Sequence, residues 1–254
     1  MNDIDLVIGF HSISAAIKNT NRTCYRLVGT ADSIKEIKKS INLPSDLKVT
    51  VLNSHQVQEE VKPYFKDLGL DYHRVPSSIF LVASSIEIKS VPFLYDLIES
   101  KKPLKIICLD QVTDVHNAAA ILRTASFYGV DAVIVPDKKS FGLTPSFFRI
   151  ASGAAEYVPL IGVSKLTRTV SKLLESNILC LALSEHAKGD LNISEIANHA
   201  SGVALILGRE DVGISNAVLR LIDNHISLDS MGDIKSLNVS IAAAITMEKC
   251  FSNN

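Results

Sequence analysis

The chain has 254 residues, enough for one large or two modest domains, and it can bury a large share of the surface that an unfolded chain exposes. Hydrophobic residues make up 47% and charged residues 21%, which excludes a disordered protein and favours an ordered globular one. The formal net charge of -1 argues against an overall basic surface for nucleic acid, so any RNA contact must come from local patches.

The first residues, "MNDIDLVIGF", lack the basic n-region of a signal peptide, and no apolar run approaches the ~20 residues that span a bilayer. We therefore expect a cytoplasmic protein, in which the sequon at Asn238 meets no glycosylation machinery. The seven histidines show no ligand spacing, and the cysteines are far apart without a CxxC pair. The sequence thus predicts no metal site and no disulfide framework, but buried free thiols at Cys24, Cys108, Cys180 and Cys250.

Residues 1–85 alternate short apolar runs with helical patterns. The runs "DLVIGF", "CYRLVGT", "LKVTVLN" and "SSIFLVAS" read as strands, and "SIKEIKKSI" reads as a helix between two of them. This pattern predicts a small α/β domain. Pro92 interrupts regular structure after it, so we expect a linker over residues 86–103 and a second domain over residues 104–254.

The second domain repeats the alternation on a larger scale. The runs "LKIICLD", "DAVIVP", "ILCLALS", "GVALILG" and "HISLD" show almost no polar alternation, as expected of strands buried on both faces. Residues 163–177 and 215–224 carry apolar stripes at helical spacing. The sequence therefore predicts an α/β fold with a parallel sheet covered by helices.

Ligands of such sheets bind beyond the carboxyl ends of the strands, which directs attention to the loops there. The loop "GREDVGIS" has the glycine spacing of a phosphate-binding loop, but Ile214 stands where the lysine is required. Glu210 adds negative charge, which disfavours a nucleoside triphosphate and suits a ligand that is cationic or rich in hydroxyls and amines. The alternative is a glycine turn whose acid lies at a helix N-terminus.

Two further loops carry polar residues at the start of a helix. In "QVTDVHNAAAILRTASFYG", a helix from about His116 places Asn117 in its first turn and Arg123 about one and a half turns later. Arg123 is then either a solvated helix residue or a clamp for phosphate. In "SLDSMGDIKSLNVS", Ser236 and Asn238 either cap the last helix or line a site.

Taken together and in this order, these loops resemble the three motifs of the SpoU (TrmH) family of RNA 2'-O-ribose methyltransferases. The first motif is similar to residues 117–125, the second to "LILGREDVG" and the third to "SLDSMGDIKSLNVSIAA". The segment "SGAAEYVPL" adds a fourth similar patch. The N-terminal "VIGFHSISAAI" resembles the ribosomal-protein-like RNA-binding domain of the subgroup that methylates guanosine riboses in large-subunit ribosomal RNA. Three positions depart from the family pattern: Ala119, Asp229 and Ser230.

The resemblance implies a fold of the SPOUT type, with a deep trefoil knot at the C-terminal end of the sheet, and a homodimer packed through the last helix. It implies S-adenosylmethionine as methyl donor, held by residues of four turns: Leu183, Ser184, Glu185, Gly208, Leu228 and Leu237. It also implies a catalytic set that consists of Asn117, Arg123, Glu210, Ser236 and Asn238.

The expected reaction is methylation of a ribose 2'-hydroxyl in structured RNA, with a guanosine of large-subunit ribosomal RNA as the favoured target. Arg123 is the family's proposed base, but a guanidinium is not deprotonated in proteins, so we expect it to clamp phosphate and the developing alkoxide. Two alternatives stay open: methylation of transfer RNA, and an RNA-binding protein of the same fold that has lost the reaction.

Overall fold

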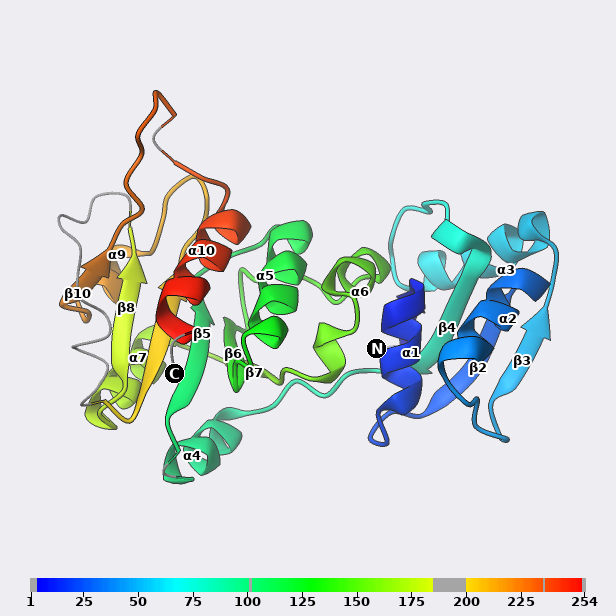
Figure 1. The fold of residues 1–254 in the computed structure, drawn as a ribbon, viewed down its shortest axis with the longest axis horizontal. Helices are drawn as coiled ribbons and strands as arrows, with labels where there is room; N and C mark the ends of the chain where they lie inside the picture. The colour runs from blue at the N-terminus through cyan, green and yellow to red at the C-terminus, as the bar shows by residue number, and fades with distance from the viewer. Residues whose placement is uncertain (1–3, 101, 185–199, 235, 253–254) are drawn as a thin grey trace. The chain divides into compact units, whose positions relative to one another are not determined.

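The structure is a computed structural model that describes residues 4–100, 102–184, 200–234 and 236–252 (Figure 1). Contacts within the chain divide it into two compact units. Unit 1 consists of Met1–Glu87 and Gly142–Tyr157, and unit 2 of Ile88–Phe141 and Val158–Asn254. A segment that follows a strand of unit 2 in the sequence therefore packs as part of unit 1.

Unit 1 is built on a four-stranded sheet of order β1-β4-β2-β3, in which β4 is antiparallel to both neighbours and β2 and β3 are parallel. The strands are β1 (Ile4–Ile8), β2 (Cys24–Gly29), β3 (Lys48–Val51) and β4 (Ile79–Ser84). The helices are α1 (Phe10–Lys18), α2 (Ala31–Ser40), α3 (Ser54–Asp67), η1 (Pro76–Ser78), α6 (Pro145–Ala151) and η2 (Ala154–Glu156).

Strand alternation gives this sheet two apolar faces. Val28 and Phe80 face α3, whose Val57, Val61 and Phe65 complete one core cluster. The strand residues that alternate with Val28 and Phe80 face the other side of the sheet, where α1 packs, and they are also fully buried. Local signals set the helix starts: Thr30 caps α2, and Asn53 and Gln56 form a capping box at α3.

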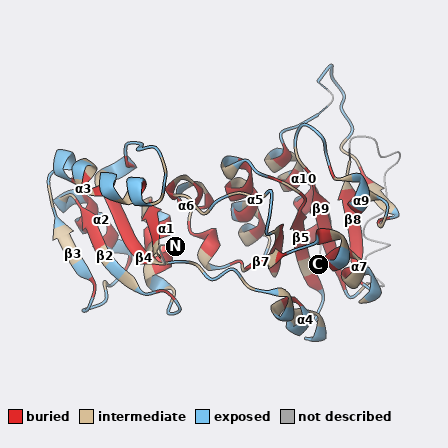
Figure 2. Cartoon of the chain, turned by 180° about the vertical axis from the view of Figure 1, so that it is seen from behind, coloured by how far each residue is buried: buried red, intermediate tan, exposed pale blue. Residues whose placement is uncertain are grey.

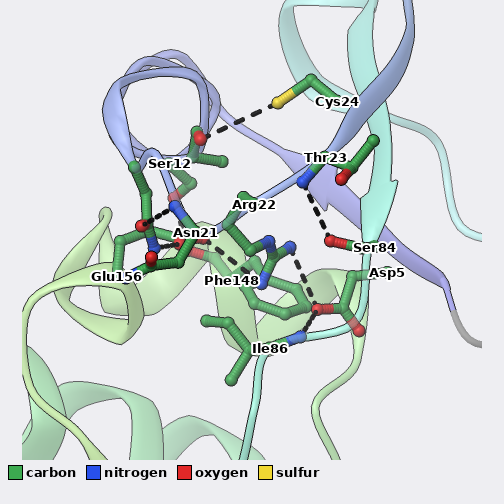
Figure 3. Close-up of polar contacts among 12 residues, drawn as sticks. Asp5, Ser12, Asn21, Arg22, Thr23, Cys24, Ser84, Ile86, Phe148 and Glu156 are labelled. Carbon is green, nitrogen blue, oxygen red and sulfur yellow. Dashed lines mark hydrogen bonds and ion pairs between the residues drawn. The ribbon is translucent and has the colours of Figure 1, made fainter.

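A buried ionic cluster, made of Asp5, Arg22 and Glu156, joins three distant parts of unit 1 (Figure 3). Nη2 of Arg22 lies 3.1 Å from Oδ2 of Asp5, and Nη1 lies 3.5 Å from Oε1 of Glu156. Within the described part of the chain none of the guanidinium nitrogens makes a well-formed hydrogen bond, so the attraction is mainly electrostatic. Burial raises the pKa of both carboxyl groups above their ordinary values, although Arg22 opposes the shift.

Further polar contacts fasten α6 and η2 to α1. The Ser12 hydroxyl donates to the Phe148 carbonyl at 2.5 Å, and the Asn19 amide donates to Oε2 of Glu156 at 2.8 Å. Gly153 has a φ of 93°, and a Cβ there would lie 2.8 Å from that of Ala15, so this contact requires glycine. Residues 142–157 thus complete unit 1.

Unit 2 is built on a six-stranded sheet of order β10-β8-β9-β5-β6-β7, whose pairs are all parallel. The strands are β5 (Leu104–Leu109), β6 (Ala132–Pro136), β7 (Leu160–Val163), β8 (Leu179–Leu183), β9 (Gly202–Leu207) and β10 (Asn224–Ile226). The helices are α4 (Val91–Glu99), α5 (Val115–Phe127), α7 (Leu166–Glu175), α9 (Asn216–Leu219) and α10 (Val239–Phe251). This confirms the predicted α/β class and parallel sheet.

Helices cover both faces of this sheet, and its central strands are buried throughout (Figure 2). On one face, α4 and α7 pack on alternate residues such as Ile106 and Ile134. On the other, α10 packs against α5 and β9. The sheet order places the carboxyl ends of β10, β8, β9 and β5 side by side. The three predicted loops, which follow β5, β9 and β10, therefore leave the sheet at the same edge.

Three details differ from the expectations. β7 was not among the predicted strands, because its four residues include Gly162 and follow Pro159 too closely to show a long apolar run. The helix expected over residues 215–224 is reduced to the short α9, although Val218 and Ile222 are buried as its stripe predicted. Within the range expected as a linker, α4 buries Leu94 in the core of unit 2.

Candidate functional site

The loop after β9 closes on itself. The Arg209 N–H donates to the Gly213 carbonyl at 3.1 Å, and the Gly213 N–H donates back to the Arg209 carbonyl at 2.9 Å. Gly213 has a φ of 67°, a conformation that favours glycine. A Cβ on Gly208 would lie 2.2 Å from the Gly213 carbonyl carbon, so no side chain fits there. The intervening residues, including Glu210, are consequently presented on an exposed turn.

Ile214, which stands where a phosphate-binding loop has lysine, is buried in the core of unit 2. The loop is also fastened to the end of β5, because the Ser215 N–H donates to Oδ2 of the buried Asp110 at 2.7 Å. Two neighbouring strand ends therefore hold this loop from both sides.

The start of α5 places Asn117 beside this loop. Asp114 is the N-cap residue, and its Oδ1 accepts a hydrogen bond from the Asn117 N–H at 2.8 Å. Asn117 lies in the first turn of the helix, as predicted, and only 8% of its surface is exposed. Its side chain must therefore find polar partners within the protein.

The start of α10 brings in the third loop. Asn238 is the N-cap residue, and its Oδ1 accepts hydrogen bonds from the Ser240 N–H at 2.9 Å and from the Ser240 hydroxyl at 2.6 Å. Its Nδ2 remains available to donate elsewhere. Asn238 therefore serves both alternatives that the sequence left open, because one end of its side chain caps the helix and the other faces the site.

These three loops meet in a hydrogen-bonded group, here called the Glu210 network, of Asn117, Glu210 and Asn238. Nδ2 of Asn117 donates to Oε1 of Glu210 at 2.8 Å, and Nδ2 of Asn238 donates to Oδ1 of Asn117 at 2.9 Å. Nδ2 of Asn238 and the Val239 N–H also donate to Oε1 of Glu210, the latter at 3.3 Å. The network thus joins Asn117 to Glu210 and Asn238, which lie 93 and 121 positions later in the sequence.

A cavity of about 380 Å³ lies on one side of the network. Its walls come from the ends of β8 and β9, the loop after β10 and the start of α10. Five residues predicted to bind the cofactor line it: Leu183, Ser184, Gly208, Leu228 and Leu237. The predicted catalytic residues Glu210 and Ser236 line it as well. Glu185 lies outside the described residues.

A second cavity of about 200 Å³ lies on the other side, between the start of α5 and the β9 loop. Asp114 and Asn117 line it, and it shares four wall residues with the first cavity: Arg209, Glu210, Asp211 and Val239. The Glu210 network therefore stands where two cavities adjoin. That arrangement suits a reaction between two ligands, one in each cavity.

Arg123 is the predicted catalytic residue that the structure does not bring to this group. It is exposed on α5 and lines neither cavity. The reason is helical geometry, because six residues carry it ~9 Å along the helix from Asn117 and about 240° around its axis.

The three departures from the family pattern have different surroundings. Ala119 is fully buried in α5. The Ser230 hydroxyl donates to the carbonyls of Gly232 and Ile234, at 3.1 and 2.5 Å, and so holds its own loop together. Asp229 is exposed and lines the first cavity, which makes that wall acidic.

Sequence reasoning missed Asp110, Asp114 and Asp211. Asp114 carried a recognisable signal, because an aspartate three residues before Asn117 at a helix start is a preferred cap. Asp211 lines both cavities and pairs with Arg209, whose hydrogen bonds hold the pKa of that carboxyl below its usual range. The bond from Ser215 to Asp110 spans 105 positions and had no local signal.

The cysteines offer no reactive thiolate. Cys108, Cys180 and Cys250 are buried free thiols, as predicted, whereas Cys24 is half-buried. Burial raises the pKa of Cys180 to about 12 and that of Cys250 to about 11. Among the described residues, no group of three or more potential metal ligands occurs, and no helix is long and apolar enough to cross a membrane.

Two known proteins are similar to this chain along much of its length. The 23S rRNA (guanosine-2'-O-)-methyltransferase RlmB of Neisseria meningitidis is 30% identical over 252 residues, covering 96% of this chain and 93% of that protein. The Escherichia coli K12 protein of the same name is 40% identical over 154 residues, covering 61% and 62% of the two chains.

Among solved structures, the SpoU methyltransferase AviRb from Streptomyces viridochromogenes, in complex with the cofactor AdoMet, superposes with a TM-score of 0.72 at 19% identity. The match covers 98% of this chain and 89% of that one, and it shows a shared fold. The sequence model of the SpoU rRNA Methylase family matches residues 105–248, which include all three loops of the site. The chain therefore belongs to the SpoU rRNA methylase family.

Proposed function

We propose that this protein transfers a methyl group from S-adenosylmethionine to the ribose 2'-hydroxyl of a guanosine in large-subunit ribosomal RNA. Membership of the SpoU family and relatives of matching length that are named for this reaction support the proposal. The observation that carries it is the Glu210 network, which stands between two adjoining cavities at the ends of parallel strands.

The first cavity fits the methyl donor. Its volume of about 380 Å³ is within the usual range for a small-molecule site, and Leu228 and Leu237 provide apolar wall. Gly208 lets the backbone of Gly213 and Ile214 approach closely, because a Cβ there would lie 2.2 Å from that backbone, and this approach shapes the cavity wall. Glu210 and Asp229 add carboxylates suited to a ligand that carries a sulfonium and an ammonium. When bound, the donor supplies an electrophilic methyl group.

The second cavity is then the place for the ribose. A displacement at the methyl carbon needs the hydroxyl aligned with the bond that breaks, so the main duty of the protein is to position the sugar. Asn117 and Asn238 are fixed by their bonds to Glu210, and such preorganised groups need little rearrangement during the reaction. Ser236 lines the donor side.

A homodimer would account for the position of Arg123. Phe127 on α5 is 83% exposed, and Ile241 and Ile245 on α10 are 52% and 38% exposed, so these neighbouring helices present apolar surface. We propose that two copies pack through α5 and α10. Arg123 of one copy would then reach an RNA phosphate at the site of the other.

We further propose that residues 1–85, completed by residues 142–157, form an RNA-binding domain of the ribosomal-protein type. Residues 86–103 would link it to the rest and contribute α4 to unit 2, and the remainder of residues 104–254 would form the catalytic SPOUT domain. The chain after β10 would be threaded as a deep trefoil knot. The return of α10 from the edge strand β10 to α5 and β9 supports this path. The enzyme would meet its RNA in the cytoplasm.

Mapping of 2'-O-methyl groups in ribosomal and transfer RNA from a deletion strain tests the function. We expect one guanosine of large-subunit RNA to lose its methyl group, and to regain it with the wild-type gene but not with Arg123→Ala. A missing methyl group in transfer RNA instead would reassign the substrate. If no site changes and calorimetry detects no S-adenosylmethionine binding at millimolar ligand, the chain is an RNA-binding protein that has lost the reaction.

A further inference from the structure

The proposed reaction leaves one chemical need unassigned, namely an acceptor for the proton of the 2'-hydroxyl. The acceptor must stand where both cavities adjoin, because the oxygen that loses the proton gains the methyl group. Three charged residues line both cavities: Arg209, Glu210 and Asp211. Arg209 cannot accept a proton, because a guanidinium is already fully protonated.

The two carboxylates differ in how much of their hydrogen-bonding capacity is free. Both oxygens of Asp211 bond to the Arg209 guanidinium, Oδ1 from Nε at 2.9 Å and Oδ2 from Nη2. Glu210 receives three donors, from Asn117, Asn238 and Val239, but all three bond to Oε1. Among the described residues Oε2 has no partner. The carboxylate is thus held by one oxygen and presents the other.

Other candidates are less well placed. Asp114 lines the second cavity alone, and its Oδ1 already caps α5. Asp229 lines only the first cavity, and Arg123 lines neither. The geometry points to Glu210 as the general base of the methyl transfer, with Oε2 receiving the hydroxyl proton. This role rests on the proposed function and deepens it.

The step balances as follows. The 2'-oxygen attacks the methyl carbon, and a new O–C bond replaces the C–S bond, whose electron pair stays on sulfur and cancels its positive charge. The hydroxyl proton passes to Oε2 of Glu210 and from there to water. The proton passes as the new O–C bond forms, because the hydroxyl becomes more acidic as its oxygen bonds to the methyl carbon.

Single-turnover methylation of large-subunit RNA from the deletion strain, measured at saturating S-adenosylmethionine, tests this role. Glu210→Gln keeps the size of the side chain and should lower the rate about 10²- to 10⁴-fold. The melting temperature should stay near that of the wild type, and calorimetry gives the S-adenosylmethionine concentration that saturates each variant. Glu175→Gln, an exposed glutamate on α7, is the matched control and should change none of these.

A second variant keeps the test decisive if Glu210→Gln folds poorly. Glu210→Ala leaves space for an external carboxylate, and formate should restore part of its rate in a concentration-dependent way. Asp114→Asn, which changes a carboxylate that lines the second cavity only, is measured as well. Formate should not raise its rate.

The role is wrong if Glu210→Gln reacts within about threefold of the wild-type rate at saturating S-adenosylmethionine. It is also wrong if Glu210→Ala folds and binds S-adenosylmethionine but formate has no effect, or if formate accelerates Asp114→Asn. An inactive wild-type protein would instead refute the proposed function itself, and the two failures are therefore distinguishable.

Discussion

The buried ionic cluster of unit 1 and the Glu210 network of unit 2 both join side chains far apart in the sequence through carboxylates. The first group is buried, whereas the second is partly exposed. In the ionic cluster, the side chains of Arg22 and Glu156 are each only 2% exposed, and protein surrounds the charges on all sides. Such a group, drawn in Figure 3, can hold chain segments together, but side chains this little exposed are not accessible to a ligand.

The Glu210 network is open. Glu210 and Asn238 are both exposed, Glu210 borders both cavities, and one of its carboxylate oxygens is left without a partner among the described residues. The comparison teaches that the residue types alone do not separate a structural group from a site. What separates them is whether the bonds within the group use all of its polar atoms and whether a cavity reaches the remainder.

The largest effect is expected from Arg22→Ala, which leaves the carboxylates of Asp5 and Glu156 buried without their cation. Such losses cost about 3–5 kcal/mol, and we expect that decrease in the free energy of unfolding by urea. Arg26→Ala is the control, because Arg26 pairs with Glu60 near the surface and should cost less than about 1 kcal/mol. Equal decreases in the free energy of unfolding for the two variants would show that burial does not distinguish the ion pairs of Arg22 from that of Arg26.

In the open group, Asn238→Ala should damage function more than folding. It removes the donor to Glu210 and Asn117, and we expect methyl transfer to fall about 100-fold. The free energy of unfolding should fall by only about 1 kcal/mol, which is typical of a lost helix cap. Asn216→Ala, an exposed asparagine of α9, should change neither. If the free energy of unfolding fell by more than the free energy that corresponds to the loss of rate, the network would serve folding rather than methyl transfer.

A pair of glycine substitutions tests whether the first cavity depends on close backbone contact. Gly208→Ala forces a Cβ against the backbone of Gly213 and Ile214, so S-adenosylmethionine affinity by calorimetry should fall at least about tenfold, or 1.4 kcal/mol. Gly232→Ala places its Cβ in open space and should leave affinity unchanged. If Gly232→Ala lowered the affinity more than Gly208→Ala, the first cavity would not depend on the close backbone contact at Gly208.

The smallest effect concerns pH. Burial raises the folded-state pKa of Glu156 above the ordinary value of 4.5, so the folded chain holds this proton more tightly than the unfolded one. Its contribution to stability is fully present below pH 4.5 and is lost as the pH rises through the folded-state pKa.

Glu156→Gln stays neutral, so the stability of the wild type relative to this variant should decrease as the pH is raised from 4.5 upward. Urea unfolding at several pH values measures this difference. Glu36→Gln, an exposed glutamate of α2, should show no such trend. A difference that grows with pH would mean that Arg22 outweighs burial.

The sequence by itself determined the class of fold and the loops that matter. The apolar runs of β5, β6, β8 and β9 have no polar alternation because both faces of a parallel sheet are covered, and this is visible without coordinates. The helix start before Asn117 and the glycines around Glu210 are likewise local features, since caps and tight turns depend on a few adjacent residues.

Only the tertiary structure decided which side chains meet. Strand order places the β9 loop beside β5 and α10, so Asn117, Glu210 and Asn238 bond to one another, while Arg123 on the same helix as Asn117 does not join them. It also assigned Glu156 to the ionic cluster of unit 1, although the strands before and after its segment belong to unit 2. The bonds of Asn117 to Glu210 and to Asn238 span 93 and 121 positions, and no local propensity encodes a contact at that separation.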